Sequence, residues 1–367
     1  MTSLAQMTDQ VLAAGFGLSL LLGFVLHRSH FCTMGAISDW WLMGSSRRAR
    51  QWALAVAVAV LGFGLLGSLG WVSPLNTIYN TPALPWLSYA LGGFLFGVGM
   101  VLASGCLSKS LVRLGGGNLK ALVVILVAAI AALATMRGFT AVVRVRWLEP
   151  VTLEWGAGPF LAQWWMRLSG QALPESCLAA ALLVGGALLL WSLWHRDMRD
   201  VDTVLGGVAL GLLVVALWWV SGVLGWLPEH PDTLESLFVG TASGRMESMS
   251  FTAPLGYWLD ALMYFSDGSK RLQLGMVLVP GVLLGAFVSA WRQGTWRIEG
   301  FASPADLIRH LLGGLLMGVG GVMAMGCTIG QGLSGLSSLN LGSLLVVLTI
   351  VLGASLTLKW QLRQATD

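Results

Sequence analysis

The chain has 367 residues, of which 56% are hydrophobic and only 10% are charged, and its formal net charge at pH 7 is +4. This composition excludes an ordinary water-soluble domain, because such domains carry about 25% charged residues. The small net charge gives no support for nucleic-acid binding. We therefore expect a polytopic protein whose main partner is the lipid bilayer.

Apolar runs recur along the whole chain at the roughly 20 residues that one helical crossing of a bilayer needs. The clear runs are 52–70, 86–103, 119–136, 178–194, 203–226, 272–291, 305–323 and 340–358. Near the N-terminus, the shorter runs 11–26 and 36–44 form one more crossing or a re-entrant pair. The sequence thus predicts an all-α fold with about nine membrane-crossing units.

The loops between these runs differ in charge. The basic loops are 45–50, 195–199 and the stretch around Arg292 and Arg297, whereas 71–85 and 227–243 carry no Lys or Arg. Because Lys and Arg are enriched in cytoplasmic loops, we expect the basic loops inside and the other two outside.

Two stretches between the crossings have a mixed pattern. Residues 137–177 alternate Arg and Glu with tryptophans, which is typical of amphipathic structure in the membrane interface. Residues 244–270 predict a short half-helix and a loop. The pair Trp40-Trp41 lies where an interfacial aromatic belt is expected.

A phrase of sixteen residues occurs twice and ends in cysteine both times. Residues 91–106 read LGGFLFGVGMVLASGC, residues 312–327 read LGGLLMGVGGVMAMGC, and eleven positions are identical. Downstream the match continues with one residue of slippage, because Asn118-Leu119 corresponds to Asn340-Leu341. A glycine-rich helix that breaks at a Gly-Cys pair has therefore been used twice.

The two copies approach their cysteines from opposite sides of the membrane. Counting crossings from the basic loop at 45–50, the first copy reaches Cys106 going inward and the second reaches Cys327 going outward. Such a pair indicates an inverted-topology repeat, which places a substrate site near the membrane midplane. We expect one integral membrane domain made of two repeat halves, residues 1–200 and 201–367.

A third break lies near the N-terminus, where an apolar run meets the polar stretch 27–35 that contains Cys32. Irregular backbone at membrane depth is tolerated only where protein or a water-filled cavity satisfies it, so the three breaks and their short re-entrant half-helices should point toward one another. The fourth cysteine, Cys177, starts an apolar helix and is expected to be a packing residue.

Three kinds of chemistry are open to these three thiols. A zinc site would add His27 or His30, but the cysteines lie far apart and lack a C-x-x-C element. A membrane thiol-redox enzyme would use disulfide exchange, with His30 as a base for Cys32. A relay of neutral thiols would conduct a soft anion, because weak contacts at successive sites allow passage. The sequence favours the relay and predicts no enzyme, metal or other cofactor.

Small and polar residues beside the thiols complete the expected substrate path. Gly105 and Gly326 let the backbone turn sharply next to two of the cysteines. The other path residues that we expect are Thr33, Ser108, Lys109, Arg113, Thr328 and Gln331. Free N–H groups where a half-helix starts favour an anion. No carboxylate inside a crossing stands out as a site for a coupling ion.

At these residues the sequence resembles the YeeE/YedE family of membrane proteins. The likeness lies in GFVLHRSHFCTMGA around Cys32, GGFLFGVGMVLASGC around Cys106 and GGLLMGVGGVMAMGCTIGQGL around Cys327. The resemblance implies an inverted-repeat fold with a central constriction lined by these three cysteines. It also implies thiosulfate uptake across a bacterial inner membrane, and a small cytoplasmic sulfur-carrier protein (TusA-like) as a partner.

The second break departs from the family pattern. Many thiosulfate-uptake members continue the Gly-Cys pair with Ala or Thr, a small residue and Gly, whereas this chain continues with Leu107-Ser108-Lys109. The additional lysine in the expected path leaves another sulfur or selenium species open as the substrate.

Overall fold

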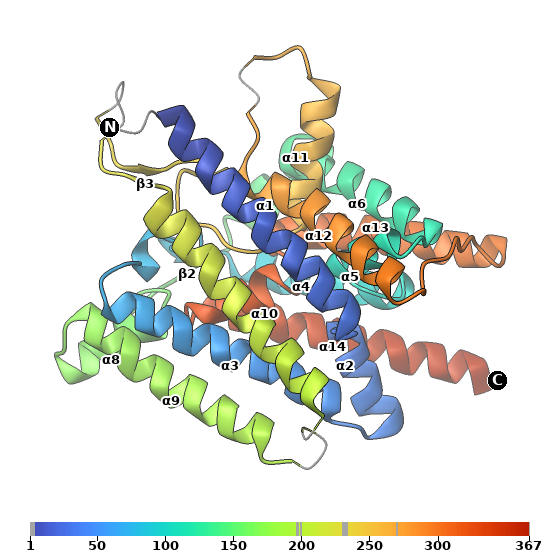
Figure 1. Cartoon of the computed structure of the whole chain (residues 1–367), viewed down its shortest axis with the longest axis horizontal. Helices are drawn as coiled ribbons and strands as arrows, with labels where there is room; N and C mark the ends of the chain where they lie inside the picture. The colour runs from blue at the N-terminus through green and yellow to red at the C-terminus, as the bar shows by residue number, and fades with distance from the viewer. Residues whose placement is uncertain (1–3, 196–197, 199, 230–233, 269–270, 367) are drawn as a thin grey trace.

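Helices dominate the computed structural model, which describes residues 4–195, 198, 200–229, 234–268 and 271–366 (Figure 1). Within these residues, nine helical stretches are long and apolar enough to cross a membrane. The long helices are α1 (Leu4–Arg28), α3 (Arg47–Ser68), α4 (Trp86–Leu102), α6 (Leu119–Arg137), α9 (Leu173–Leu193), α10 (Val201–Trp219), α12 (Leu274–Arg292), α13 (Pro304–Met323) and α14 (Leu341–Thr366). The expected all-α polytopic fold is confirmed.

Short helices follow or interrupt these crossings. They are α2 (Thr33–Ser38), the π-helical turn η1 (Asp39–Met43), α5 (Leu107–Gly115), α11 (Thr252–Met263) and the π-helical turn η6 (Gly330–Gly335). Near the N-terminus, α1 is a full crossing of 25 residues by itself, and the second apolar run there folds as α2 and η1. Of the two alternatives for this region, a single crossing followed by a short helix is the correct one.

Most of the small elements gather at one end of the bundle, which we call the loop end. They are η2 (Pro74–Asn76), α7 (Phe139–Val143), η3 (Arg144–Leu148), α8 (Leu161–Ser169) and η5 (Val220–Leu224). Two short antiparallel sheets join loops there: β1 (Ala83–Leu84) pairs with β2 (Leu153–Glu154), and β3 (Trp226–Leu227) pairs with β4 (Leu237–Phe238). A bridge between Thr77 and Met246 ties two further loops together.

The other end carries the basic loops, and we call it the basic end. Arg47 pairs with Asp200, and Arg28 Nη2 lies 3.3 Å from Asp202 Oδ1, so ion pairs connect the loops that flank α1, α3 and α10. Residues 196, 197 and 199 of one predicted basic loop lie outside the described residues. Which side of the membrane each loop faces stays a prediction.

Helices α4 and α13, which contain the duplicated phrase, cross in antiparallel directions at glycines. A Cβ added at Gly92 would lie 2.7 Å from the carbonyl oxygen of Gly320, and one at Gly313 would lie 2.8 Å from that of Gly99. In the duplicated phrase, Gly92 corresponds to Gly313, and Gly99 corresponds to Gly320. A two-fold axis between the two helices therefore exchanges these two contacts. Both helices cross the membrane, so this axis lies in the membrane plane and the repeat is inverted.

The helix after each break packs on the broken helix of the other copy. A Cβ at Gly97 of α4 would lie 2.2 Å from the carbonyl oxygen of Ile350 in α14, and one at Gly318 of α13 would lie 2.5 Å from that of Ala128 in α6. Positions 128 and 350 correspond once the one-residue slippage is allowed. Small residues let membrane helices approach this closely, and the four helices form one intertwined centre. The boundary between the halves at residue 200 stays a prediction.

Candidate functional site

Each of the three breaks holds a residue in left-handed backbone geometry two positions before its cysteine. The φ angles are 49° at His30, 56° at Ser104 and 52° at Met325. For a residue other than glycine, this geometry costs on the order of 1–3 kcal/mol and persists only where the surrounding structure holds it. The same strain at three corresponding places indicates that the breaks share one backbone design.

Glycine is required directly before two of the cysteines. The φ angles of Gly105 and Gly326 are 157° and 159°. A Cβ at Gly105 would lie 3.1 Å from Cγ of Lys109, and one at Gly326 would lie 3.2 Å from Cγ of Gln331. Backbone geometry and space therefore both favour glycine here, as the duplicated Gly-Cys pairs predicted.

The thiols lie at the starts of the short helices. The backbone N–H of Gly35 donates to Cys32 Sγ at 3.3 Å, and that of Gly330 donates to Cys327 Sγ at 3.4 Å. In the middle break, Cys106 Sγ and Ser108 Oγ lie 3.1 Å apart. Cys106 and Cys327 are buried, and Cys32 is half-buried.

The fold brings the three breaks together around the middle cysteine. Cys106 lies within electrostatic interaction range of both Cys32 and Cys327. Cys177 lies elsewhere, in a small cavity between α3 and α9 that Phe63 and Gly64 also line. All four cysteines are free thiols. The structure thus joins three of the thiols in the order Cys32, Cys106, Cys327.

Positive charge gathers on the basic-end side of this series. Lys109 interacts electrostatically with His27, His30 and Cys32, and no described carboxylate forms an ion pair with it. Arg113 Nη1 donates to the carbonyl oxygen of Ser104 at 3.3 Å. The basic-end mouth of the series is therefore cationic.

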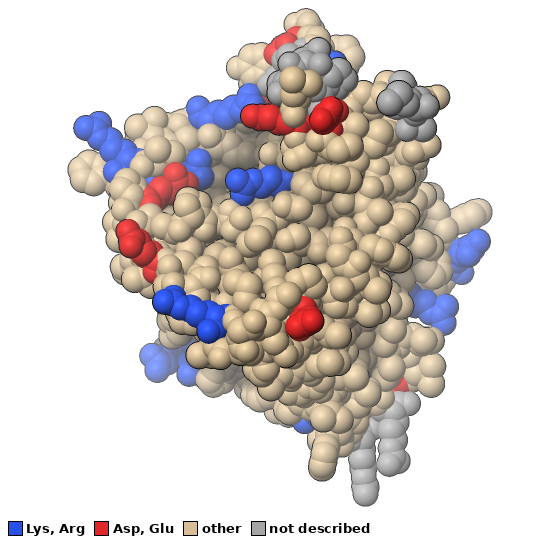
Figure 2. Space-filling view, turned by 90° about the vertical axis from the view of Figure 1, so that its left-hand side faces the viewer, with Lys and Arg blue, Asp and Glu red and all other residues tan. Residues whose placement is uncertain are grey.

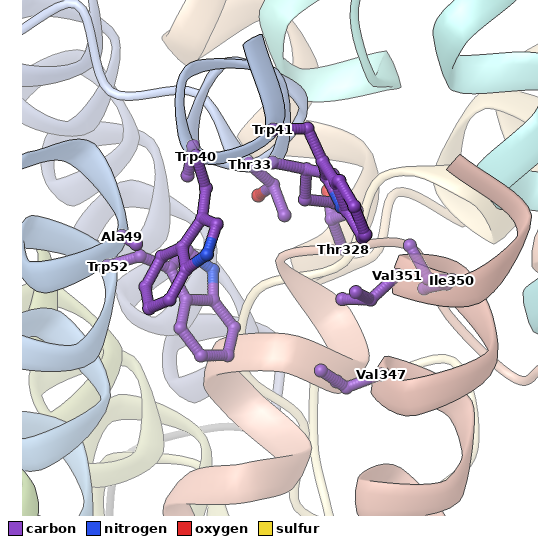
Figure 3. Close-up of a pocket in the computed structure, with 11 residues that line it drawn as sticks. Thr33, Trp40, Trp41, Ala49, Trp52, Thr328, Val347, Ile350 and Val351 are labelled. Atoms are coloured by element: carbon purple, nitrogen blue, oxygen red, sulfur yellow. The ribbon is translucent and has the colours of Figure 1, made fainter. Parts of the chain in front are cut away.

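Thr33 and Thr328, which follow two of the three cysteines, line one cavity of about 290 Å³ between α2, α3 and α14 (Figure 3). Its other walls are mostly apolar and aromatic. The hydroxyl of Thr328 and the indole N–H of Trp52 have no hydrogen-bond partner within the described structure. Trp40 and Trp41, expected in an interfacial belt, are about half exposed and line this cavity as well.

At the loop end, two further cavities lead toward Cys327. One of about 220 Å³ is lined by Met325 and Gly326, and one of about 300 Å³ is lined by Arg137 and Arg271. Both share Ala242 and Tyr257, so they adjoin each other. Figure 2 views the molecule from this end and shows a hollow with Lys or Arg side chains near it.

Gln331, an expected path residue, uses its amide within the protein. Its Nε2 donates to the carbonyl oxygen of Ala324 at 2.6 Å, and its Oε1 accepts from the hydroxyl of Ser343. Gln331 is fully buried. It therefore supports the backbone around the third break, and its place in the substrate path stays a prediction.

Several residues near the thiols were not indicated by the sequence. Tyr79 donates its hydroxyl to the carbonyl oxygen of Gly330 at 2.6 Å, and Trp52 and Glu247 line two of the cavities. These residues lie far from any cysteine along the chain. The available signal was weak: polar residues in a Gly- and Ser-rich stretch between two crossings.

The zinc alternative finds no donor set in the described part of the chain, where no three His, Cys, Asp or Glu side chains come together as metal ligands. The rings of His27 and His30 are 6.4 Å apart between centroids, and His27 Nδ1 lies 3.1 Å from Ser289 Oγ. These two histidines lie beside Lys109 at the basic-end mouth.

Comparison with known proteins matches a family described as "Sulphur transport" over residues 28–356. The thiosulfate transporter TsuA of Escherichia coli is 27% identical over 329 residues, which cover 88% of this chain and 87% of that protein. TsuA of Spirochaeta thermophila is 28% identical over 363 residues, covering 94% and 97%. The probable transporter YedE of Escherichia coli is 31% identical over 96 residues, covering 24% and 22%.

Proposed function

Because the chain belongs to the sulphur-transport family, whose YeeE/YedE members it resembles, we propose that it takes up thiosulfate or a closely related sulfur-containing anion. We place it in the inner membrane of a bacterium, in keeping with the nine apolar helices among its described residues. The observation that carries the proposal is the convergence of three free thiols at three strained breaks, with Cys106 in range of the other two.

On this proposal the anion meets the thiols in the order Cys327, Cys106, Cys32. The loop-end cavity of about 220 Å³ reaches Met325 and Gly326, directly before the first thiol, and the cationic mouth begins beside the last. If the basic end is cytoplasmic, as the distribution of Lys and Arg indicates, this order describes uptake.

Neutral thiols suit a soft anion that has to keep moving. The S–H group is a weak donor, and its sulfur is polarizable. Contact with a terminal sulfur atom therefore gives a weak attraction that does not trap the anion at one site. Conduction needs that balance at each of several successive sites.

The proximity of the thiols also supports a second candidate, a membrane thiol-redox enzyme. Two neighbouring thiols can form a disulfide, with their two electrons and two protons passing to a quinone, which becomes a quinol. Such an enzyme would turn over a dithiol and would not move an anion into vesicles. The named relatives are transporters, so we propose transport without catalysis.

We further propose that a small cytoplasmic sulfur-carrier protein of the TusA type meets the chain at its basic end. Arg28 and Arg47 are exposed there and pair with Asp202 and Asp200, so the basic end presents a surface of mixed charge to a soluble partner. Co-purification of such a carrier with the wild type, and its loss when both arginines are replaced by Gln, would test this part.

The proposal is tested with purified protein in liposomes and isotopically labelled thiosulfate. We expect uptake above that of empty liposomes, and the same result in cells that lack other sulfur-oxyanion importers. Related sulfur and selenium anions are tested in parallel, because Lys109 distinguishes this chain from many family members. If none of these anions enters above the empty control while a dithiol reduces a quinone, the redox enzyme is the better description.

A further inference from the structure

The loop-end route toward Cys327 contains an acidic side chain. Glu247 lines the cavity of about 220 Å³ together with Met325 and Gly326. Among the described residues that line this cavity, it is the one carboxylate, and no Lys or Arg accompanies it. It lies in the segment between η5 and α11, which backbone bonds hold against the loop before β1: Met246 N–H donates to Asn76 O at 2.9 Å.

The carboxylate of Glu247 is held in place without being neutralised. Its Oε1 accepts from the backbone N–H of Ser243 at 2.9 Å and from the Ser243 hydroxyl at 2.6 Å. No described residue forms an ion pair with it. Burial raises the pKa of the Glu247 carboxyl, and the two hydrogen bonds from Ser243 act in the opposite direction.

The titratable groups that face Glu247 come from three elements. The hydroxyls of Tyr79 and Tyr257 lie within electrostatic range of the carboxylate, and Arg137 acts on Tyr257. Arg245, the nearest cation along the chain, donates instead to a backbone carbonyl at 2.8 Å. None of these groups cancels a negative charge on Glu247 by a direct contact.

An ionised Glu247 therefore opposes an anion in the same cavity. Two like charges that share a cavity of low dielectric constant repel each other. The repulsion doubles for a dianion. Protonation of the carboxyl removes it, and leaves a neutral group that donates a hydrogen bond to the anion.

We propose that Glu247 is a proton-binding site linked to the anion path, so that each anion enters the loop-end cavity together with one proton. This inference rests on the proposed function, since the anion is the transported one. The proton binds a carboxylate oxygen as an O–H group, and no electrons are transferred. By linkage, protonation raises the anion affinity by the factor by which the anion raises the proton affinity.

The test uses cells that lack other sulfur-oxyanion importers and measures thiosulfate uptake while only the external pH is varied. We expect wild-type uptake to rise several-fold as the external pH falls, because protonation of Glu247 removes the repulsion. Glu247→Gln keeps an acceptor for Ser243 and has no charge to titrate, so its uptake should be insensitive to external pH. The matched control is Glu235→Gln, an exposed carboxylate at the same end.

A second measurement follows protons directly. Addition of thiosulfate to purified wild-type protein in weakly buffered solution should take up one proton per bound anion, and Glu247→Gln should take up none. Absence of both uptake and binding in the wild type at every pH overturns the proposed function and this inference together. Uptake whose pH dependence is the same in wild type and Glu247→Gln overturns only the assignment to Glu247.

Discussion

The breaks at Cys106 and Cys327 have the same backbone conformation and differ in the charges around it. The residues two positions before the cysteines have φ angles of 56° and 52°, and the intervening glycines 157° and 159°. Three positions after Cys106 stands Lys109, whereas the third position after Cys327 is Gly330, whose N–H donates back to the thiol. One scaffold thus holds a cationic environment in its first copy and an uncharged one in its second.

This difference shows that the repeat is symmetric in its backbone, whereas the charges along the path differ between its two ends. The two-fold axis at the crossing of α4 and α13 makes the two broken helices equivalent in backbone. Direction therefore has to come from side chains that the duplication did not preserve. Lys109 at the basic end and Glu247 at the loop end are two such side chains, with opposite charges.

The largest expected effect is loss of transport when a thiol is removed from either copy. Cys106→Ala and Cys327→Ala each remove an S–H group with little change in volume, and uptake of thiosulfate should fall close to the background of empty liposomes. Cys32→Ala should behave in the same way. If only one of Cys106→Ala and Cys327→Ala kept near-normal uptake, the two breaks would have unequal roles.

The control for these three variants is Cys177→Ala. Its thiol packs between α3 and α9, away from the breaks, so uptake should stay close to that of the wild type. Protein level in the membrane is measured for all four variants, because a loss of insertion would imitate a loss of transport.

The next effect is on stability, and it tests the two-fold axis. Gly92→Ala and Gly313→Ala, at symmetry-related positions, would each place a Cβ within 2.8 Å of a backbone oxygen of the opposite helix. Overpacking of this kind costs about 1–3 kcal/mol, and the two costs should be similar. The free energy of unfolding in detergent measures them, with Gly186→Ala as the control because open space surrounds that position. Clearly unequal costs would contradict a symmetric crossing.

A smaller effect sharpens the difference in charge between the copies. Lys109→Gly introduces the residue type that stands at this position in the second copy. Transport of a dianion should weaken more than transport of a monoanion, because a dianion is attracted more strongly by the lysine. Lys109→Met separates this effect from the cost of glycine inside α5, which is about 1 kcal/mol. Equal losses for both anions in both variants would assign the lysine to packing or insertion.

The smallest expected effect is that of metal removal. If the thiols act as neutral donors, purified protein should contain substoichiometric zinc, and a chelator should leave thiosulfate uptake unchanged. Elemental analysis and uptake with and without the chelator check this. If the wild type contained stoichiometric zinc and Cys32→Ala did not, the thiols would form a metal site and not a relay.

The sequence predicted the crossings and the breaks because both leave local signals. Apolar length marks a crossing, and the eleven positions shared by residues 91–106 and 312–327 mark a shared break. The surroundings of the thiols could not be predicted, because they depend on contacts between loops. Tyr79 reaches Gly330 across more than half the chain, and Glu247 is placed by a loop with no periodic pattern. No local rule connects such pairs of residues.

The glycine crossing of α4 and α13 also affects how the protein is made. During synthesis at about 5–20 residues per second, the partner glycines of α13 emerge on the order of 10 to 40 seconds after those of α4. Until then the glycine face of α4 contacts lipid. The helix is stable there because it satisfies its own backbone hydrogen bonds. A chain cut after its first half should therefore insert, stay unpacked at its centre, and become a substrate for membrane proteases.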